Sequence, residues 1–531
     1  MMHNIHNQIK RGEIMRQTTM HLRTMYQPSA TTLDPALDTI NHQGGHAWNK
    51  SIKEKLFQMA MTGTLTNSFY VSQEDMVCES AKLLESAEAN DIAVAIVKGR
   101  NEGFIRAFNI LGLVILSKKS PTLFREVFPE VVKTGNDLED FIGMCRSVRK
   151  FGRSVKTAMT NWISKNLSEH YAIKYRRQIA DAMRIAHPVL HDTTAQPTLA
   201  KYVSAHYHHD ESMTFNSLNY DLTVIPMINA MELAKNAINE KDYKKASKLI
   251  IDNRLDPMTI IGCGFEDNIL IWTALAKVMP VMMTLKYLNK LIRSGAYEKC
   301  MQEIHSKLCV KNLKSAKVFP FRLVTAIEAI DDASTMDTAK HNVELIAHLN
   351  TVTEKYVTEY DWTSLNTKSF AICPDVSGSM TSPVKNGIVP SKISALFTAF
   401  FLKGLDNAIV LPWDTVLHKL DTENTSLFDI INTIKNSHGG GTCMTVPLDH
   451  LSSNHIKRDI VMIITDSENM DCNVQMSWLK YRKQFPTAKL VFLRVDSYST
   501  NPVSDVFSEE NDVYQIYGWN DNVIKFIEYV I

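Results

Sequence analysis

Several absences narrow the protein class before any motif is considered. No apolar run has the length that spans a bilayer, and the polar, His-rich N-terminus lacks the apolar core of a signal peptide. Charge of either sign is not in excess, with 58 Lys and Arg against 57 Asp and Glu. We therefore expect a soluble protein without a membrane partner. Any nucleic-acid surface must be local, because the bulk charge does not provide one.

Paired cysteines and phosphate-binding loops are also missing. The eight cysteines are scattered without a Cys-x-x-Cys spacing, which favours reduced thiols and a cytoplasmic location. No Gly-x-x-x-x-Gly-Lys-Ser/Thr loop occurs, and no acid and base are spaced as a catalytic pair near the polar turns described below. We expect a binding protein that is not an enzyme.

The length of the chain predicts more than one domain. With 531 residues, of which 45% are hydrophobic and 22% charged, the chain is globular and too long for one ordinary core. We predict a polar N-terminal tail over residues 1–45, a helical domain over residues 46–360 and an α/β domain over residues 361–531. The tail is interpreted as a free tail or a docking strand.

The middle of the chain has helical periodicity in pieces of 10 to 20 residues with short connections. Such a series predicts an α-solenoid of helix pairs rather than a compact bundle. Ser72 and Asn136 are candidate N-caps, and residues 57–70 are predicted to form a loop or short strand. The clearest predicted helices are 103–116, 138–149, 154–167, 173–185, 226–239, 268–278, 281–294 and 342–349.

After Tyr360 the pattern changes to short Val- and Ile-rich runs that alternate with helices. This order predicts a doubly wound, mostly parallel sheet. The predicted strands are 370–373, 408–411, 459–464, 490–495 and 513–516. The predicted helices are 392–405, 427–435, 445–451, 475–482 and 523–530.

A candidate metal site lies where the first of these strands ends. Asp375, Ser377 and Ser379 alternate directly after the apolar run 369–372, and ligands in such folds bind at the carboxyl ends of the strands. One carboxylate and two hydroxyls on a tight turn suit a hard divalent cation such as Mg²⁺, which prefers oxygen ligands and keeps several waters.

Two later stretches complete the candidate site. Three glycines precede Thr442, and Asp466 ends the buried strand 460–465. In this order the three stretches resemble the metal-ion-dependent adhesion site of von Willebrand factor A domains. The resemblance implies that Ser377, Ser379 and Thr442 bind the metal directly, whereas Asp375 and Asp466 act mostly through waters.

A basic cluster between Arg146 and His187 is hidden by the balanced composition. Ten Lys and Arg lie there with only Glu169 and Asp181 as acids. Separations of three, seven and ten residues allow four of the basic residues to share one helix face, which suits contacts to RNA phosphates: Lys174, Arg177, Arg184 and His187. Lys150, Arg153 and Lys156 precede them.

The aromatic residues within this stretch leave two interpretations open. Trp162, Tyr171 and Tyr175 alternate with the basic residues and could stack on unpaired bases. Alternatively, the helix face is simply solvated and the aromatics belong to the core. His187, taken alone, is better explained as a core histidine, and only its basic neighbours favour a role in RNA binding.

The same stretch resembles the TROVE module of the Ro ribonucleoprotein autoantigen family. The resemblance rests on residues 152–153, 158–162, 172–175 and 181–188, with further blocks at 57–70, 100–116, 271–272, 279–280 and 288–295. It implies HEAT-like helical repeats that close into a ring with a C-terminal von Willebrand factor A domain. It also implies a monomer that binds small noncoding Y-type RNAs and the single-stranded ends of misfolded or decaying RNAs, in RNA quality control or stress response. Some relatives work beside an exoribonuclease.

Two departures from the family pattern concern the metal site. Cys443 stands where the family commonly has Asp after Gly-Gly-Thr, and Ser467 stands where it often has Asn. Both leave the five predicted ligands in place but change the charge around them. An alternative function is a metal-dependent protein-protein scaffold without RNA, in which the metal takes an Asp or Glu of a partner. A subunit of a metal-chelatase-type machine is a weaker alternative.

Overall fold

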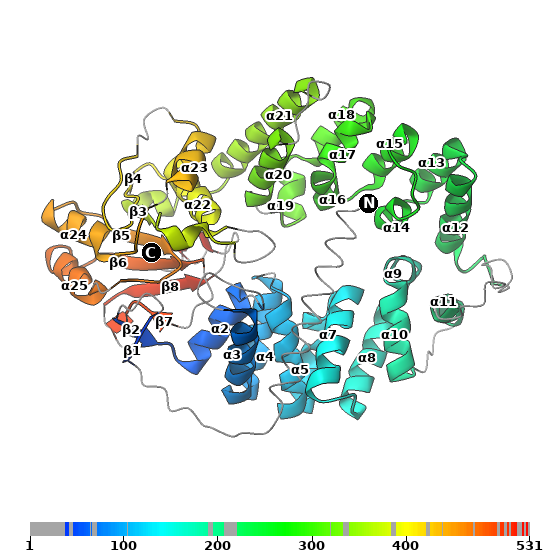
Figure 1. Cartoon of the computed structure of the whole chain (residues 1–531), viewed down its shortest axis with the longest axis horizontal. Helices are drawn as coiled ribbons and strands as arrows, with labels where there is room; N and C mark the ends of the chain where they lie inside the picture. The colour runs from blue at the N-terminus through cyan, green and yellow to red at the C-terminus, as the bar shows by residue number, and fades with distance from the viewer. Residues whose placement is uncertain are drawn as a thin grey trace. The chain divides into compact units, whose positions relative to one another are not determined.

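The computed structural model describes most of the chain, shown in Figure 1. The described residues are 38–41, 46–63, 65, 72–103, 105–188, 195–205, 220–318, 320–332, 339–383, 389–420, 425–437, 439–470, 473–495, 500–503, 507–508, 511–517, 523–524 and 527–528. The chain divides into two compact units. Of the described residues, one unit contains those within 132–146 and 150–356, and the other contains those within 38–131, 147–149 and 357–528.

Helices that pack side by side form the whole of the first unit apart from its connections. This arrangement confirms the predicted series of helix pairs, whereas closure into a ring stays a prediction. The helices are α7 (Gly135–Val148, whose last two residues belong to the other unit), α8 (Arg153–Asn166), α9 (Glu169–Lys174), α10 (Arg176–Ala186), α11 (Ala195–Ser204), α12 (Pro226–Asn239), α13 (Tyr243–Asp252), α14 (Pro257–Ile261), α15 (Ile269–Val278), α16 (Val281–Lys286), α17 (Leu288–Arg293), α18 (Ala296–Lys307), α19 (Val310–Ser315), α20 (Phe321–Asp332) and α21 (Ala339–Thr358).

The second unit begins with five more helices, which pack against one another. These are α2 (Ile52–Thr62), α3 (Gln73–Ser86), α4 (Ala89–Asn101), α5 (Ala107–Lys119) and α6 (Pro121–Val131). The predicted loop or strand over residues 57–70 is therefore wrong for residues 57–62. Ser51 caps the helix by accepting from the Glu54 amide at 3.2 Å, and Leu56 and Met59 are buried. Residues 66–70 lie outside the described residues.

Two N-caps were predicted from the sequence, and the structure confirms one of them. Ser72 is an N-cap as predicted, because its Oγ accepts from the Asp75 amide at 3.1 Å. The predicted cap at Asn136 is wrong. Thr134 and Asp137 form a reciprocal pair instead, with the Thr134 amide donating to Asp137 at 2.9 Å and the Asp137 amide donating to Thr134 at 3.3 Å.

A five-stranded parallel sheet forms the centre of the second unit, as predicted for a von Willebrand factor A fold. Its order is β4-β3-β5-β6-β8. In this order, β3 pairs with β5 in a register that sets Pro374 opposite Ile464. The strands are β3 (Phe370–Pro374), β4 (Ala408–Val410), β5 (Ile460–Thr465), β6 (Lys489–Arg494) and β8 (Val513–Tyr517).

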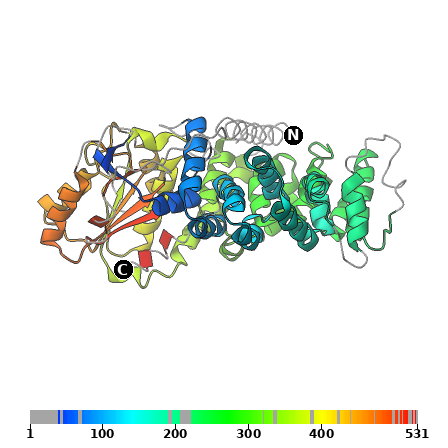
Figure 2. The same ribbon diagram turned by 90° about the horizontal axis from the view of Figure 1, so that it is seen from below.

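Both faces of this sheet are covered by helices (Figure 1 and Figure 2). On one face, Ala371, Val461 and Leu490 pack with Trp478 and other residues of α24 (Thr445–Ser453) and α25 (Val474–Gln484). Helix α22 (Pro390–Gly404) contacts β3, β4 and β5 and packs on α23 (Leu427–Asn436). Burial on both sides explains why the strands read as continuous apolar runs.

The N-terminal segment pairs with this α/β part through a second, small sheet. Strands β1 (Asp38–Ile40) and β2 (His46–Asn49) form an antiparallel pair, and β2 also pairs with β7 (Thr500–Asn501). Buried Arg494 supports the attachment, since it donates to the Asn501 side chain at 2.9 Å. The last part of the predicted tail is thus a docked strand, and residues 1–37 lie outside the described residues.

The structure bears on two expectations, the reduced state of the cysteines and the absence of membrane-spanning helices. Six cysteines are free thiols, as predicted: Cys78, Cys145, Cys263, Cys300, Cys309 and Cys373. Cys443 is disulfide-bonded, so the prediction of reduced thiols is wrong there. Within the described part of the chain, no helix has the length and apolar character that a bilayer span requires.

In both units, basic side chains donate hydrogen bonds to the backbone carbonyls at the carboxyl ends of neighbouring helices. Lys307 donates to the carbonyls of Ala276, Lys277 and Met279 at 2.6, 2.8 and 3.0 Å, at the end of α15. Burial lowers the pKa of its ammonium group. Since these carbonyls have no partner within the helix, the lysine satisfies groups that the helix leaves open.

Replacing this lysine tests how much the cap contributes. We expect Lys307→Met to lower the free energy of unfolding by about 2 kcal/mol, because hydrogen bonds from a charged donor contribute about 1.5–3 kcal/mol. The measurement is the urea midpoint of the whole chain. Lys299→Met, an exposed position on the same helix, is the control, and an equal shift in both variants would contradict the capping role.

Candidate metal centre and nucleic-acid interface

The turn after β3 is fixed by its two neighbouring strands. The Asp375 amide donates to the Ile464 carbonyl of β5 at 2.9 Å, and the Val376 amide donates to the Trp413 carbonyl beyond β4 at 2.9 Å. The chain therefore leaves the sheet between β4 and β5, at the carboxyl ends of its strands. This is the edge where parallel α/β folds bind ligands.

The side chains of this turn point toward one another as the sequence predicted. Asp375 accepts from the Ser377 amide at 2.8 Å and from the Thr465 hydroxyl at 2.6 Å. The Oγ atoms of Ser377 and Ser379 are 3.2 Å apart. One carboxylate and two hydroxyls thus lie in one small buried region.

Backbone hydrogen bonds bring the other two predicted loops to the same place. The Gly439 amide donates to the Val376 carbonyl at 2.8 Å, and the Gly378 amide donates to the Gly440 carbonyl at 3.2 Å. The Met470 amide donates to the Thr442 carbonyl at 2.8 Å. This bond links the loop after β5 to the loop of three glycines, residues 439–441, which we call the glycine loop. All five predicted ligands are buried, with exposed fractions of 0–6%: Asp375, Ser377, Ser379, Thr442 and Asp466.

The electrostatics of the centre favour a cation. Burial raises the pKa of Asp375 to about 6, in spite of the hydrogen bonds from Ser377 and Thr465 that lower it. The nearby Asp414 adds to the rise. No Lys or Arg of the described residues pairs with Asp375, and a buried carboxylate without a positive partner is costly.

The donor set also limits which cation fits. Two carboxylates and three hydroxyls supply only oxygen atoms, the ligands of Mg²⁺ and Ca²⁺. Among the described residues, no group of three or more His, Cys, Asp or Glu is arranged to hold a metal, so a nitrogen- or sulfur-rich site of the zinc type is not seen there. The residues of the centre therefore fit a hard divalent cation.

Asp414 is a member of this region that the sequence analysis missed. Its carboxylate is buried, accepts from the Val416 amide at 2.9 Å and lies 3.1 Å from Nε2 of His418. Burial raises the pKa of Asp414, but these contacts outweigh burial and leave the pKa below its usual value. Its position just after a parallel strand, like that of Asp375, was the available signal.

The predicted RNA-binding residues fall on three consecutive helices and their ends. Arg153 and Lys156 lie on the first two turns of α8, and Arg153 begins that helix. Lys150 and His187 are exposed at the loop before α8 and at the end of α10, with φ of 65° and 50°. Lys174 ends α9, whereas Arg177 and Arg184 lie exposed on α10.

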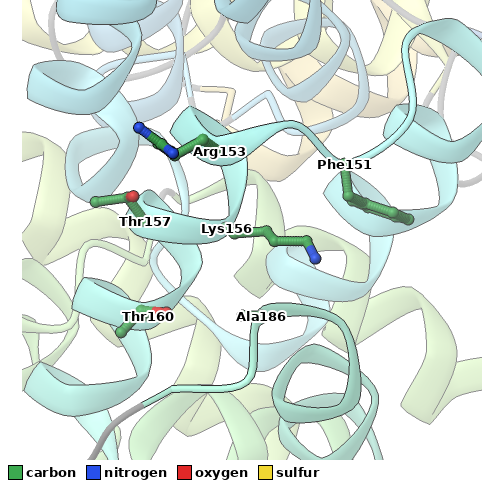
Figure 3. Close-up of a pocket in the computed structure, with 6 residues that line it drawn as sticks. All are labelled: Phe151, Arg153, Lys156, Thr157, Thr160 and Ala186. Atoms are coloured by element: carbon green, nitrogen blue, oxygen red, sulfur yellow. The ribbon is translucent and has the colours of Figure 1, made fainter.

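Part of this basic cluster lines a pocket (Figure 3). Arg153 and Lys156 border it together with two threonines of α8, Thr157 and Thr160, and with Phe151 and Ala186 from the neighbouring segments. Its volume is about 460 Å³. Figure 3 shows the Lys156 side chain running across the space between α8 and the end of α10. The pocket is therefore lined by cations and hydroxyls.

The single helix face predicted from residues 174–187 does not form. Tyr175, with φ −123° and ψ 31°, separates α9 from α10, so Lys174 lies on a different helix from Arg177 and Arg184. Lys174 sits over the Tyr175 ring at 5.4 Å, and Arg177 forms an ion pair with Glu139. These two side chains have partners within the protein.

The aromatics of the cluster belong mainly to the core. Trp162 is 3% exposed, and its Nε1 donates to the Val132 carbonyl at 2.7 Å. Tyr175 is 7% exposed, and half-buried Tyr171 donates to the Lys133 carbonyl at 3.1 Å. The three rings pack on one another. Of the two interpretations of these aromatics, the structure favours the core.

Comparisons with known proteins agree with this architecture. Residues 265–372 match the family model of the TROVE domain, and residues 369–530 match that of the Ro60 vWA domain. Of the quoted TROVE blocks, those at 271–295 lie inside the first match. No curated protein matches the sequence.

A solved structure shares the fold. The crystal structure of the Deinococcus radiodurans Ro (RSR) protein is similar over 90% of this chain and 99% of that chain, with a TM-score of 0.64 and 16% sequence identity. The chain thus carries a match to the TROVE domain followed by a match to the Ro60 vWA domain, within a fold that the Deinococcus Ro protein shares.

The glycine loop of the metal centre allows a direct test. A Cβ atom at Gly439 would lie 1.4 Å from Oδ2 of Asp414, whereas a Cβ atom at Gly440 would meet nothing within 4 Å. We expect Gly439→Ala to displace the loop and lower the free energy of unfolding by about 1–3 kcal/mol, the usual cost of overpacking.

Gly440→Ala is the matched control and should leave stability nearly unchanged. The urea midpoints of the two variants and the wild type make the comparison. Equal stability of Gly439→Ala and Gly440→Ala would contradict the close approach of the glycine loop to Asp414.

Proposed function

We propose that the protein binds RNA at the pocket in front of α8. The observation that carries this proposal is the amino end of α8, where Arg153 and Lys156 line the pocket and no acidic residue occupies the first turn. Gly152, the N-cap, supplies no side-chain hydrogen bond. The positive end of the helix dipole adds to the two cations, and this combination suits a phosphate group.

The chemistry of the pocket supports recognition of the RNA backbone. Cations and hydroxyls that contact phosphates fix the position of an RNA without reading its sequence. Lys150 and His187 are exposed at the ends of the flanking segments. Lys174, Arg177 and Arg184 on the neighbouring helices extend the proposed surface, although Lys174 and Arg177 already have the contacts described above.

The similarity to the TROVE and Ro60 vWA domains supports a proposal for the kind of RNA. We propose that small noncoding Y-type RNAs and the single-stranded ends of structured RNAs are the ligands, in RNA quality control or a stress response, with an exoribonuclease as a further partner. The chain would act as a monomer in the cytoplasm, a location that the six free thiols favour although Cys443 is disulfide-bonded.

A divalent cation at the second centre is part of the same proposal. Ser377, Ser379 and Thr442 would contact Mg²⁺ through their hydroxyls, and Asp375 and Asp466 would balance its charge directly or through water. The cation would neutralise the buried carboxylates and leave coordination positions for water or for a ligand.

A protein ligand at this cation is the second candidate function. Val416 and Met470 are 57% and 41% exposed. Val416 follows Asp414 closely in the sequence, and Met470 Sδ would lie 2.3 Å from a Cβ atom at Gly441. Exposed apolar groups beside a buried cation suit a partner that supplies an Asp or Glu from an apolar surface. Such binding would make the chain a scaffold with or without RNA.

RNA binding is tested by changing the two pocket cations together. We expect Arg153→Gln/Lys156→Gln to weaken binding of a hairpin RNA with a single-stranded end about tenfold. The slope of log K against log salt should fall by about 1.4, since each lost phosphate contact on a single strand contributes about 0.7. Fluorescence anisotropy across a salt series measures both values.

Lys244→Gln/Lys245→Gln is the matched control, because it removes the same charge from two exposed lysines on α13. A duplex RNA without overhangs tests the preference for free ends. If the pocket variant and the control lose the same affinity, binding depends on general charge and the pocket has no special role.

The cation site predicts a reversal of stability between two conditions. In EDTA, Asp375→Asn should be at least as stable as the wild type, because it removes a buried carboxylate. With Mg²⁺ at about a hundredfold excess over its Kd, the wild type should gain about 2.7 kcal/mol and the variant should gain nothing. Thermal unfolding in EDTA, in MgCl₂ and in NaCl of equal ionic strength measures the effect, and an unchanged wild type in MgCl₂ would contradict the site.

A further inference from the structure

Asp414 occupies a position at the cation site that the five predicted ligands do not account for. It follows β4, the neighbour of β3, and the preceding Trp413 forms a parallel bridge with Asp375. Its side chain is 4% exposed. The carboxylate lies against Gly439, which leaves no room for a side chain there.

The glycine loop is attached to Asp414 at one end and to the Asp375–Ser379 turn at the other. The Cys443 amide donates to the Asp414 carbonyl at 3.0 Å, just after the predicted ligand Thr442. The Gly439 amide reaches the Val376 carbonyl within the Asp375–Ser379 turn. The loop that provides Thr442 therefore crosses directly over the Asp414 carboxylate.

This loop carries no acid of its own. Cys443 follows Thr442, so the predicted ligand set contains only Asp375 and Asp466 as carboxylates. Asp414 supplies a third negative charge from another strand, directly after Trp413, which forms a parallel bridge with Asp375. The contacts of this carboxylate with the Val416 amide and with His418 favour its charged form.

We propose that Asp414 is an affinity-determining acid of the cation site, which acts on the bound cation through its charge without being a ligand. The inference rests on the proposed cation site and goes beyond it, because it assigns a role to a residue outside the five ligands. Through-space attraction is proportional to the charge of the cation. The effect of Asp414 should therefore grow from a divalent to a trivalent ion.

Trp413 supplies a probe for this test. Its ring is buried beside the site, and its Nε1 donates to the Cys373 carbonyl at 3.0 Å. A Tb³⁺ ion bound near an indole emits after excitation of that indole, so Tb³⁺ luminescence reports occupancy. Competition with Ca²⁺, an oxygen-seeking ion of similar size, gives the affinity for a divalent cation in the same assay.

The variants are Asp414→Asn and, as a matched control, Asp406→Asn in the full chain. Both remove one carboxylate, but Asp406 is exposed and lies before β4, at the opposite end of the strand from Asp414. We expect Asp414→Asn to weaken Ca²⁺ binding about tenfold and Tb³⁺ binding about thirtyfold, in line with the ratio of charges. Asp406→Asn should change neither value appreciably.

The outcomes distinguish an effect of the Asp414 charge on the cation from an effect on the shape of the loop and from no effect at all. Equal fold losses for Ca²⁺ and Tb³⁺ would show that Asp414 only shapes the loop, and unchanged affinities would show that it has no role, so both overturn the inference. Absence of saturable Tb³⁺ binding in the wild type would overturn the cation site itself. RNA binding of the same preparations, measured in parallel, separates that failure from a failure of the RNA proposal and shows that the variants are folded.

Discussion

The parallel pairing of β3 with β5 is the constraint on which the metal centre depends. Because Pro374 lies opposite Ile464, Asp375 comes level with Thr465, whose hydroxyl donates to it at 2.6 Å, and Asp466 follows one residue later. The hydrogen bond from the Asp375 amide to the Ile464 carbonyl continues the ladder by one more residue. A register shift of one residue would turn these side chains to the other face of the sheet. The hydroxyls and the glycine loop are arranged around this fixed point.

A second interaction, the hydrogen bond from a basic side chain to a carbonyl at the end of a neighbouring helix, recurs in the helical parts. Basic residues that form it are less available to bind RNA. Arg149, Arg176 and Lys119 resemble Lys307 in donating to carbonyls at the ends of neighbouring helices. Arg176 reaches the Tyr202 carbonyl at 3.0 and 2.7 Å, at the end of α11. Positive charge at a helix carboxyl end is stabilising, because the dipole is negative there. The density of Lys and Arg in the sequence therefore overstates the positive surface that RNA can meet.

The sequence predicted the features that depend on local patterns. Continuous apolar runs located the five strands of the main sheet, and the order of Asp375, Thr442 and Asp466 along the chain identified the loops that meet at the candidate metal centre. The features that it missed depend on contacts between distant segments. Tyr175 interrupts an otherwise helical pattern where its side chain lies against Gly135, and Asp414 reaches the centre only because β4 pairs beside β3. Asn136 is not the N-cap that the sequence predicted, because Thr134 and Asp137 pair with each other at the start of α7 instead.

The balanced composition is explained by how the two signs of charge are placed. The formal net charge of +1 includes buried carboxylates at the metal centre, where a bound cation would cancel them without affecting the field at distant surfaces. Exposed cations such as Lys150 and Arg153 contribute to the electrostatic potential around the protein without such cancellation. Because ions in solution screen charges beyond about 8–10 Å, an RNA at the proposed α8 pocket would respond mainly to the charges close to it. Local placement, and not the total charge, therefore determines whether this chain can attract a phosphate backbone.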